Sequence, residues 1–374
     1  MKKREFSMLN FSFVRKFPSE IKMQNSKCNM FSKLKMQTAE TFKFVLFIFL
    51  ACILFLAGCS RKNEVPAENQ SQKIKVVATI FPLYDWAKNI VLGSENADVE
   101  LLIKNGVDLH SFQPSTADIV KILSADILIY VGGESDFWIN DTLKNSVNKN
   151  MIQINLMEEL SDSIKEEEFV DGMTEEKEIH APELAEHTHD EVEYDEHLWL
   201  SVKNAQSAVK KIAQILKEKD AAESDLIEEN EIKYLEILEQ LQNDGKTIRS
   251  EAGSESKDKE TIIVCDRFPF RYMTDELGIK YYAAFVGCSA ETEASFETIA
   301  FLSGKIRELG ATKVFVTESS DKKIARTVIK NAGLTEDKCK IVTLDSMQST
   351  TLAQAESGKN YIDIMKKNYQ KISE

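Results

Sequence analysis

Short apolar runs that alternate with helical patterns constrain the fold of this chain more than any other feature. In the first half, buried strands are predicted at residues 75–80, 99–103 and 126–131. In the second half, they are predicted at residues 261–265, 279–285, 313–317 and 340–344. Strands that alternate with helices form parallel sheets wrapped by helices. We therefore predict an α/β protein with two similar lobes, each a parallel sheet wrapped by helices.

One long helix is predicted between the two halves. From about residue 224 to residue 249, Tyr234, Leu238 and Leu241 recur at helical spacing. Such a helix would join the lobes as a rigid connector. We expect an N-terminal lobe at 74–220, a linker helix at 221–252 and a C-terminal lobe at 253–374. Because ligands of open parallel sheets bind beyond the carboxyl ends of the strands, a cleft between the lobes is the expected binding site.

The N-terminal segment resembles a secretory signal. Residues 44–58 read FVLFIFLACILFLAG and follow a basic leader with ten Lys and Arg. The sequence LAGC that ends at Cys59 resembles the bacterial lipobox, in which the cysteine is lipidated. We expect a signal peptide at 1–58 and a flexible tether at 59–73, hence an extracytoplasmic, membrane-anchored lipoprotein in the periplasm or on the cell surface. A transmembrane anchor is the alternative, but the run is short for a hydrocarbon core of about 30 Å.

The charge of the mature chain favours cations. Residues 1–58 hold ten of the 47 basic and three of the 61 acidic residues, so the rest carries 37 against 58, a formal charge of −21. Such a chain repels nucleic acid and attracts metal ions. Apart from Cys59, this part has only three cysteines, too few for a disulfide scaffold. One pair among Cys265, Cys288 and Cys339 would leave one thiol free as a ligand.

Four of the five histidines, His180 to His197, fall within 18 residues, in or directly after one acidic segment. All five lie between positions 110 and 197, and residues 158–196 hold 17 Asp and Glu against two Lys. This segment is too long for an ordinary loop. It is interpreted as an auxiliary metal loop in which His180, His187 and His189 bind metal weakly and concentrate cations near the cleft. A passive, solubilising insert is the alternative.

Four residues are predicted to bind metal in the cleft: His110, His197, Cys265 and Asp345. Each lies after a strand or in a linking loop. Two imidazoles, a thiolate and a carboxylate suit four-coordinate zinc. Each residue also has a structural alternative: His110 as a turn residue, Cys265 as a small buried hydrophobe and Asp345 as a turn cap.

Several motifs resemble one family of metal receptors. GVDLHSFQPS (106–115) and EHLWLS (196–201) resemble the first two ligand motifs of the solute-binding lipoproteins of zinc and manganese ABC transporters, the cluster A-I or cluster 9 family. DRFPFRYMTDELGI (266–279) and LDSMQSTT (344–351) are similar to the regions of the third and fourth ligands. The His-rich loop is typical of the zinc branch. The resemblance covers about residues 74–374.

The resemblance implies a receptor and not an enzyme. It implies two (β/α)4-like lobes joined by one rigid helix, with zinc (or manganese) bound in the cleft between them. It also implies that the metal is delivered to a membrane permease that a cytoplasmic ATPase drives. The sequence departs from the family at Leu109 and Ser201-Val202, where proline and Asp-Pro are usual, and at Cys265, where histidine or glutamate is usual. At the third position, water, a loop residue, or less readily Asp266, Glu291 or Glu318 are the alternatives to Cys265.

Three other functions are compatible with parts of the sequence. A manganese or iron receptor of the same family, or a surface lipoprotein with a role in cell adhesion, has the same leader and charge. A secreted zinc hydrolase fits less well, because the chain has no HExxH motif and no histidine after His197.

Overall fold

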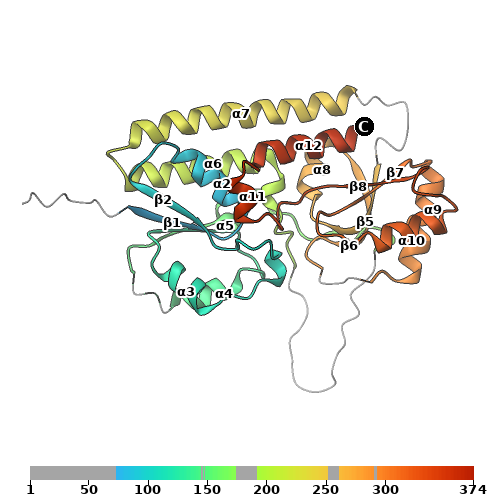
Figure 1. The fold of residues 1–374 in the computed structure, drawn as a ribbon, viewed down its shortest axis with the longest axis horizontal. Helices are drawn as coiled ribbons and strands as arrows, with labels where there is room; N and C mark the ends of the chain where they lie inside the picture. Colours follow the sequence, from blue (N-terminus) through green and yellow to red (C-terminus); the bar gives the residue numbers. More distant parts are fainter. Residues whose placement is uncertain (1–72, 145, 147, 174–191, 252–260, 290–292) are drawn as a thin grey trace, which may run out of the picture. The chain divides into compact units, whose positions relative to one another are not determined.

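The computed structural model describes residues 73–144, 146, 148–173, 192–251, 261–289 and 293–374. These residues belong to one compact unit, Ser71–Glu374. The unit contains two four-stranded parallel sheets, one from each half of the chain (Figure 1). The predicted α/β class with two lobes is confirmed.

The N-terminal sheet has the strand order β2-β1-β3-β4, and all neighbours pair in parallel. Its strands are β1 (Ile74–Ala78), β2 (Ala97–Leu101), β3 (Ile127–Tyr130) and β4 (Ile152–Asn155). The sequence predicts the first three. It does not reveal β4, because four residues that alternate apolar and polar side chains give too short a signal.

Among the described residues, five α-helices follow or cover these strands before the connector. They are α2 (Phe81–Ile90), α3 (Thr116–Leu123), α4 (Phe137–Lys144), α5 (Leu156–Glu159) and α6 (Val202–Lys219), followed by the long helix α7 (Ser224–Glu251). Helix α2 begins at Phe81-Pro82, because proline in the first turn of a helix gives up no needed hydrogen bond. Helix α3 starts with a capping box of Ser115 and Asp118.

The C-terminal sheet has the order β6-β5-β7-β8, again parallel throughout. Its strands are β5 (Thr261–Phe268), β6 (Lys280–Val286), β7 (Lys313–Val316) and β8 (Lys340–Thr343). Its helices are α8 (Arg271–Leu277), α9 (Phe296–Leu309), α10 (Lys323–Asn331), α11 (Leu352–Glu356) and α12 (Tyr361–Ser373). Gly278 and Gly310 end α8 and α9 in the left-handed conformation, at φ of 63° and 67°.

Helices α7 and α12 connect the two lobes. Helix α7 runs above both sheets, and α12 lies beside it near the C-terminus (Figure 1). The first residue of α12, Tyr361, donates its backbone N–H to Asp85 of α2 at 3.2 Å and its hydroxyl to the carbonyl of Trp199 at 2.7 Å. One apolar core extends from the first sheet through these helices to β5 and β6. The shared core and these hydrogen bonds join the two lobes.

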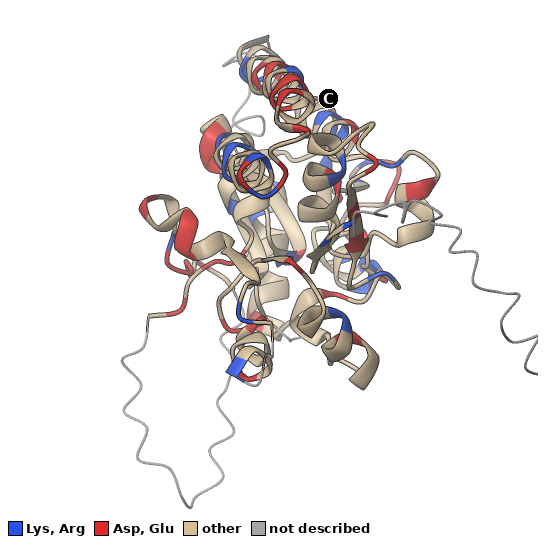
Figure 2. Cartoon of the chain, turned by 90° about the vertical axis from the view of Figure 1, so that its left-hand side faces the viewer, with Lys and Arg blue, Asp and Glu red and all other residues tan. Residues whose placement is uncertain are grey.

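The surface is mixed in charge and carries no membrane span among the described residues. In Figure 2, both acidic and basic residues lie along the long helix at the top. Within the described parts of the chain, no helix combines the length and the apolar character that a membrane span needs.

Candidate metal centre

His110 lies at the carboxyl end of the N-terminal sheet, in a short 3-10 helix (Leu109–Ser111) that follows β2. The carboxylate of Asp108 accepts the backbone N–H of His110 at 3.0 Å and so starts this turn. Asp108 also forms an ion pair with Arg267, which belongs to β5. The backbone around His110 is thus tied directly to the second lobe.

His197 precedes another 3-10 helix, Leu198–Leu200, and its side chain is fully buried. The Oδ1 atom of Asp195 accepts the backbone N–H of His197 at 2.9 Å and lies 2.8 Å from its Nδ1. Because an ionised carboxylate only accepts hydrogen bonds, Nδ1 carries the proton. The Nε2 lone pair of His197 is then free to bind a cation.

The two imidazole rings face each other. Their Nε2 atoms are 3.2 Å apart, and the Nδ1 of His110 lies 2.6 Å from the hydroxyl of Ser135. Two nitrogen lone pairs at this distance repel unless a proton or a cation lies between them. Burial lowers the pKa of His110 to about 3, helped by positive charge at His197, so His110 is a neutral ligand at pH 7. Burial by itself lowers the pKa of His197, but the hydrogen bond to Asp195 and the negative charge of Asp195 raise the pKa of His197 overall.

The thiol of Cys288 completes a group of three donors. Cys288 comes two residues after the end of β6, and its Sγ lies with one nitrogen from each of His110 and His197 inside a 4.8 Å limit. A side chain at Gly287 would bring a Cβ to 3.0 Å from Cε1 of His197, so glycine is needed for this approach. Burial raises the pKa of Cys288, and the charge of Glu167 raises it further. The free thiol therefore gives up a proton when it binds metal.

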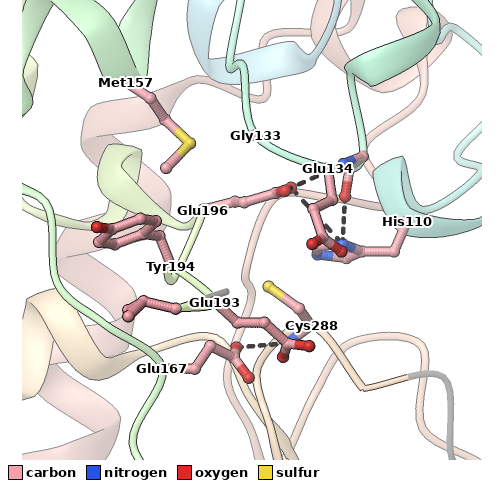
Figure 3. A pocket seen from close by; sticks show the side chains of 11 residues that line it. His110, Gly133, Glu134, Met157, Glu167, Glu193, Tyr194, Glu196 and Cys288 are labelled. Atoms are coloured by element: carbon pink, nitrogen blue, oxygen red, sulfur yellow. Dashed lines mark hydrogen bonds and ion pairs between the residues drawn. The ribbon is translucent and has the colours of Figure 1, made fainter. Parts of the chain in front are cut away.

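A cavity of about 320 Å³ opens beside these donors. His110 and Cys288 line it, and the sulfur of Cys288 points into it (Figure 3). Its walls also contain four carboxylates, those of Glu134, Glu167, Glu193 and Glu196. One oxygen of Glu167 and one of Glu196 are buried without a hydrogen-bond partner. A buried, unpaired carboxylate oxygen is costly, so this wall fits a cation.

Cys265 is not in this group. It is 1 % exposed and packs in the second apolar core, with residues such as Leu302 and Val328 of the outer helices. The sequence places it at the end of a strand, but β5 continues to Phe268, so Cys265 lies in mid-strand. Burial raises the pKa of its thiol well above the usual range. The structure thus gives Cys265 the packing role that the sequence offered as the alternative to a ligand.

Asp345 is also outside the group of three donors. Its carboxylate forms an ion pair with Lys359 at 2.8 Å and accepts the backbone N–H of Met347 at 2.8 Å. It follows β8, whereas Cys288 follows β6, and these strands are the two edges of the sheet. At about 4.8 Å per strand, their ends are about 14 Å apart. The geometry agrees with a turn cap at Asp345.

Several residues that the sequence analysis names lie outside the described residues. They are the predicted ligands His180, His187, His189 and Glu291, and Cys59, the predicted site of lipidation.

Asp266 and Glu318 are described, and both are engaged elsewhere. Asp266 accepts the hydroxyl of Thr317 at 2.9 Å, and Glu318 accepts the hydroxyl of Ser346 at 2.9 Å. Cys265, Cys288 and Cys339 are all free thiols, so none of the disulfides considered from the sequence forms among these described residues.

A scan of protein families supports the resemblance that the motifs suggest. The model described as "Zinc-uptake complex component A periplasmic" matches residues 76–374. The chain belongs to this family. The match to zinc-uptake component A covers both sheets and the residues His110, His197 and Cys288. The family consists of transport components and not of enzymes.

Curated relatives carry matching names. The chain is 27 % identical over 331 residues to the high-affinity zinc uptake system protein ZnuA of Bacillus subtilis, which covers 88 % of this chain and 96 % of that protein. It is 27 % identical over 334 residues to the zinc-binding protein AdcA of Streptococcus pyogenes serotype M3. That match covers 88 % of this chain but 61 % of AdcA, so the chain spans about three fifths of the streptococcal relatives.

Solved structures share the fold. A metal-dependent lipoprotein, YcdH of Bacillus subtilis, aligns with a TM-score of 0.60 at 25 % identity, over 80 % of this chain and 98 % of that one. The zinc-bound ZnuA-like domain of AdcA from Streptococcus pneumoniae aligns with a TM-score of 0.58 at 24 % identity, over the same shares. The second likeness concerns the fold alone.

Proposed function

We propose that this protein is an extracytoplasmic receptor that binds one Zn²⁺ tightly between its lobes and delivers it to the permease of an ABC transporter. The observation that carries the proposal is the convergence of His110, His197 and Cys288 within 4.8 Å. Two of these donors come from one lobe and the third from the other. Nitrogen and thiolate ligands are those that zinc prefers. The names of the relatives support zinc as the cargo.

The donor set favours zinc over manganese or iron. Cys288 contributes a soft sulfur donor, which suits zinc and disfavours hard ions such as Mn²⁺. His197 is held by Asp195 in the tautomer that a metal needs, and His110 is neutral. A manganese receptor is the alternative within the family. It predicts that manganese competes with zinc at similar concentrations, whereas our proposal predicts a preference for zinc by several orders of magnitude.

The acidic loop is proposed to hold additional, weakly bound zinc. His180, His187 and His189 are the donors that its sequence offers. Removing residues 174–191 deletes these three histidines and keeps residues 158–173 and 192–196, the two ends of the loop. The shortened protein should keep one tight zinc and lose weakly bound zinc. Loss of the tight site in calorimetry would mean that the loop supplies a primary ligand.

Delivery to a permease and its ATPase is tested with the mature protein, residues 59–374. Zinc-loaded protein is added to right-side-out membrane vesicles that contain the cognate permease. ATP and a fluorescent zinc indicator are enclosed in the vesicles, and zinc uptake is followed with and without ATP. The proposal predicts uptake from the loaded protein and none from a His110→Ala variant that lacks bound zinc. Equal uptake with free zinc alone would refute the receptor role. Hydrolytic turnover of test esters or peptides by the zinc-loaded protein would favour the hydrolase instead.

A further inference from the structure

The two ends of the acidic loop form a short antiparallel pair beside the metal centre. Residues 165–167 and 193–195, here named the base ribbon, are joined by a bridge between Glu166 and Tyr194. The backbone N–H of Glu167 donates to the carbonyl of Glu193 at 2.8 Å, and that of Asp195 donates to the carbonyl of Lys165 at 2.9 Å. Glu167 is therefore held in the same ribbon as Asp195, the residue that orients His197.

The C-terminal lobe holds the base ribbon in place. The hydroxyl of Tyr272 donates to the carbonyl of Asp195 at 2.9 Å and accepts the backbone N–H of Lys165 at 3.0 Å. The backbone N–H of Cys288 donates to Oε1 of Glu167 at 3.0 Å (Figure 3). This last bond places the carboxylate of Glu167 next to the residue that supplies the thiol.

The second carboxylate oxygen of Glu167 has no partner. Its Oε2 is buried and accepts no hydrogen bond, although the side chain lines the same cavity as His110 and Cys288. Glu196 is the other cavity carboxylate with a buried, unpartnered oxygen, and it is less suited to reach the ion. Glu196 uses Oε1 to accept the N–H of Ser135, and its Oε2 faces Nδ1 of His110 at 3.8 Å, on the side of the ring away from His197.

We propose that Glu167 is the fourth ligand of the metal, supplied by the base of the acidic loop. The inference rests on the proposed function of this site as a zinc receptor. A rotation of the Glu167 side chain brings its free oxygen towards the three donors, while its backbone stays in the base ribbon. The resulting set has two neutral imidazoles, one thiolate and one carboxylate. Its two negative charges neutralise a divalent ion in a buried site, which three donors alone would leave with a net positive charge.

Glu167→Gln tests this assignment with little change in shape. Glutamine keeps an oxygen that accepts the N–H of Cys288 but removes the charged donor oxygen. Glu168→Gln is the matched control, because it removes the same charge from the next residue, whose carboxylate accepts the hydroxyl of Tyr281. We expect zinc affinity, measured by competition with a chromophoric chelator, to fall at least tenfold further in Glu167→Gln than in Glu168→Gln.

Cobalt substitution distinguishes a ligand from a residue that only positions Cys288. With Co²⁺, the sulfur-to-metal charge-transfer band should persist in Glu167→Gln, while the d–d bands that report four-coordinate geometry should change. A positioning role alone would weaken the sulfur band and leave the coordination number unchanged. Equal zinc affinity in the two variants, with identical d–d spectra, would overturn the proposal.

Two further results keep the test decisive. If Glu167→Gln unfolds, Glu167→Asp keeps the charge but shortens the side chain, and it should weaken zinc binding while the metal-free protein melts like the wild type. Unchanged affinity in Glu167→Asp would then count against the ligand. If the wild-type protein itself binds no zinc tightly, the proposed function fails, and Glu167 is not the cause.

Discussion

Replacing each of two cysteines by serine should separate metal binding from packing. Cys288→Ser changes a thiol that lies with His110 and His197 in the group of three donors. Cys265→Ser makes the same chemical change in the apolar core, at a side chain that is 1 % exposed. Because the two substitutions are chemically identical, any difference between them comes from the surroundings of each residue.

The expected loss of zinc affinity in Cys288→Ser is large. Removing a partner that only orients a ligand usually reduces metal affinity by about 10- to 100-fold. Loss of the only sulfur donor should exceed this range, so we expect more than about 100-fold weaker binding, equal to about 2.7 kcal/mol. Manganese binding should change far less, because Mn²⁺ gains little from a thiolate.

The expected effect of Cys265→Ser is on stability alone. A hydroxyl buried among apolar side chains without a partner costs about 1–3 kcal/mol. With an unfolding entropy of about 2.1 cal/mol/K per residue over some 300 residues, this lowers the melting temperature of the metal-free protein by about 2–5 °C. The dissociation constant for zinc should stay within a factor of about three of the wild type, because no contact to the metal is lost.

Two assays on both variants decide the outcome. Calorimetry or chelator competition gives the dissociation constant for zinc, and thermal unfolding of the metal-free protein gives stability. We expect Cys288→Ser to change the first and Cys265→Ser the second. The reasoning is refuted if Cys265→Ser weakens zinc binding as much as Cys288→Ser does, or if Cys288→Ser binds zinc like the wild type.

Three further predictions concern Gly287, Asp85 and Cys59. Gly287→Ala puts a methyl group 3.0 Å from the ring of His197 and should weaken zinc binding at least about tenfold. Gly304→Ala, in open space on α9, is the control and should not change zinc affinity; equal affinities of the two variants in a zinc titration would exclude this steric effect. Burial raises the pKa of Asp85 to about 6, so the stability linked to its protonation is present in full below pH 3.8 and lost as the pH rises through 6. Asp85→Asn should therefore gain up to about 3 kcal/mol over the wild type between pH 4 and pH 7 in urea unfolding, and a pH-independent difference would disprove the assignment. Cys59→Ala should release the protein from membranes without changing zinc affinity, and a variant that still sediments with membranes would argue against lipidation at this residue.

The sequence predicts the fold well because the strands are apolar and the helices are periodic. Seven of the eight strands that the structure describes have a predicted counterpart. The features that escape prediction are short or depend on distant contacts. Strand β4 has only four residues. Helix α12 is not predicted, and it packs against α7 and α2, which lie far from it in the sequence.

Two of the three donors that the structure brings together could be predicted from sequence, and the third could not. His110 and His197 lie in loops whose motifs are distinctive. The apolar run TIIVC predicts a strand that ends at Cys265, and the sequence therefore favours Cys265 as the thiolate ligand. Parallel pairing with β6 extends β5 to Phe268 instead. Because ligands of parallel sheets lie beyond the strand ends, the observed ends of β5 and β6 make Cys288, and not Cys265, the thiol that we propose as a ligand.

The role of Glu167 could not be predicted from sequence for a different reason. It is one of 17 acidic residues between positions 158 and 196, and nothing in the composition distinguishes it. Its position depends on the base ribbon and on the bond from the N–H of Cys288, two contacts that join segments far apart in the chain.

X-ray absorption at the zinc K-edge tests the central claim most directly, because it counts the sulfur atoms bound to the metal. The measurement uses the mature protein loaded with one equivalent of zinc, together with the Cys288→Ser variant. We predict one sulfur at about 2.3 Å and nitrogen or oxygen ligands at about 2.0–2.1 Å, with the sulfur absent in the variant. A wild-type spectrum with nitrogen and oxygen alone, or a sulfur that persists in Cys288→Ser, would contradict the site described here.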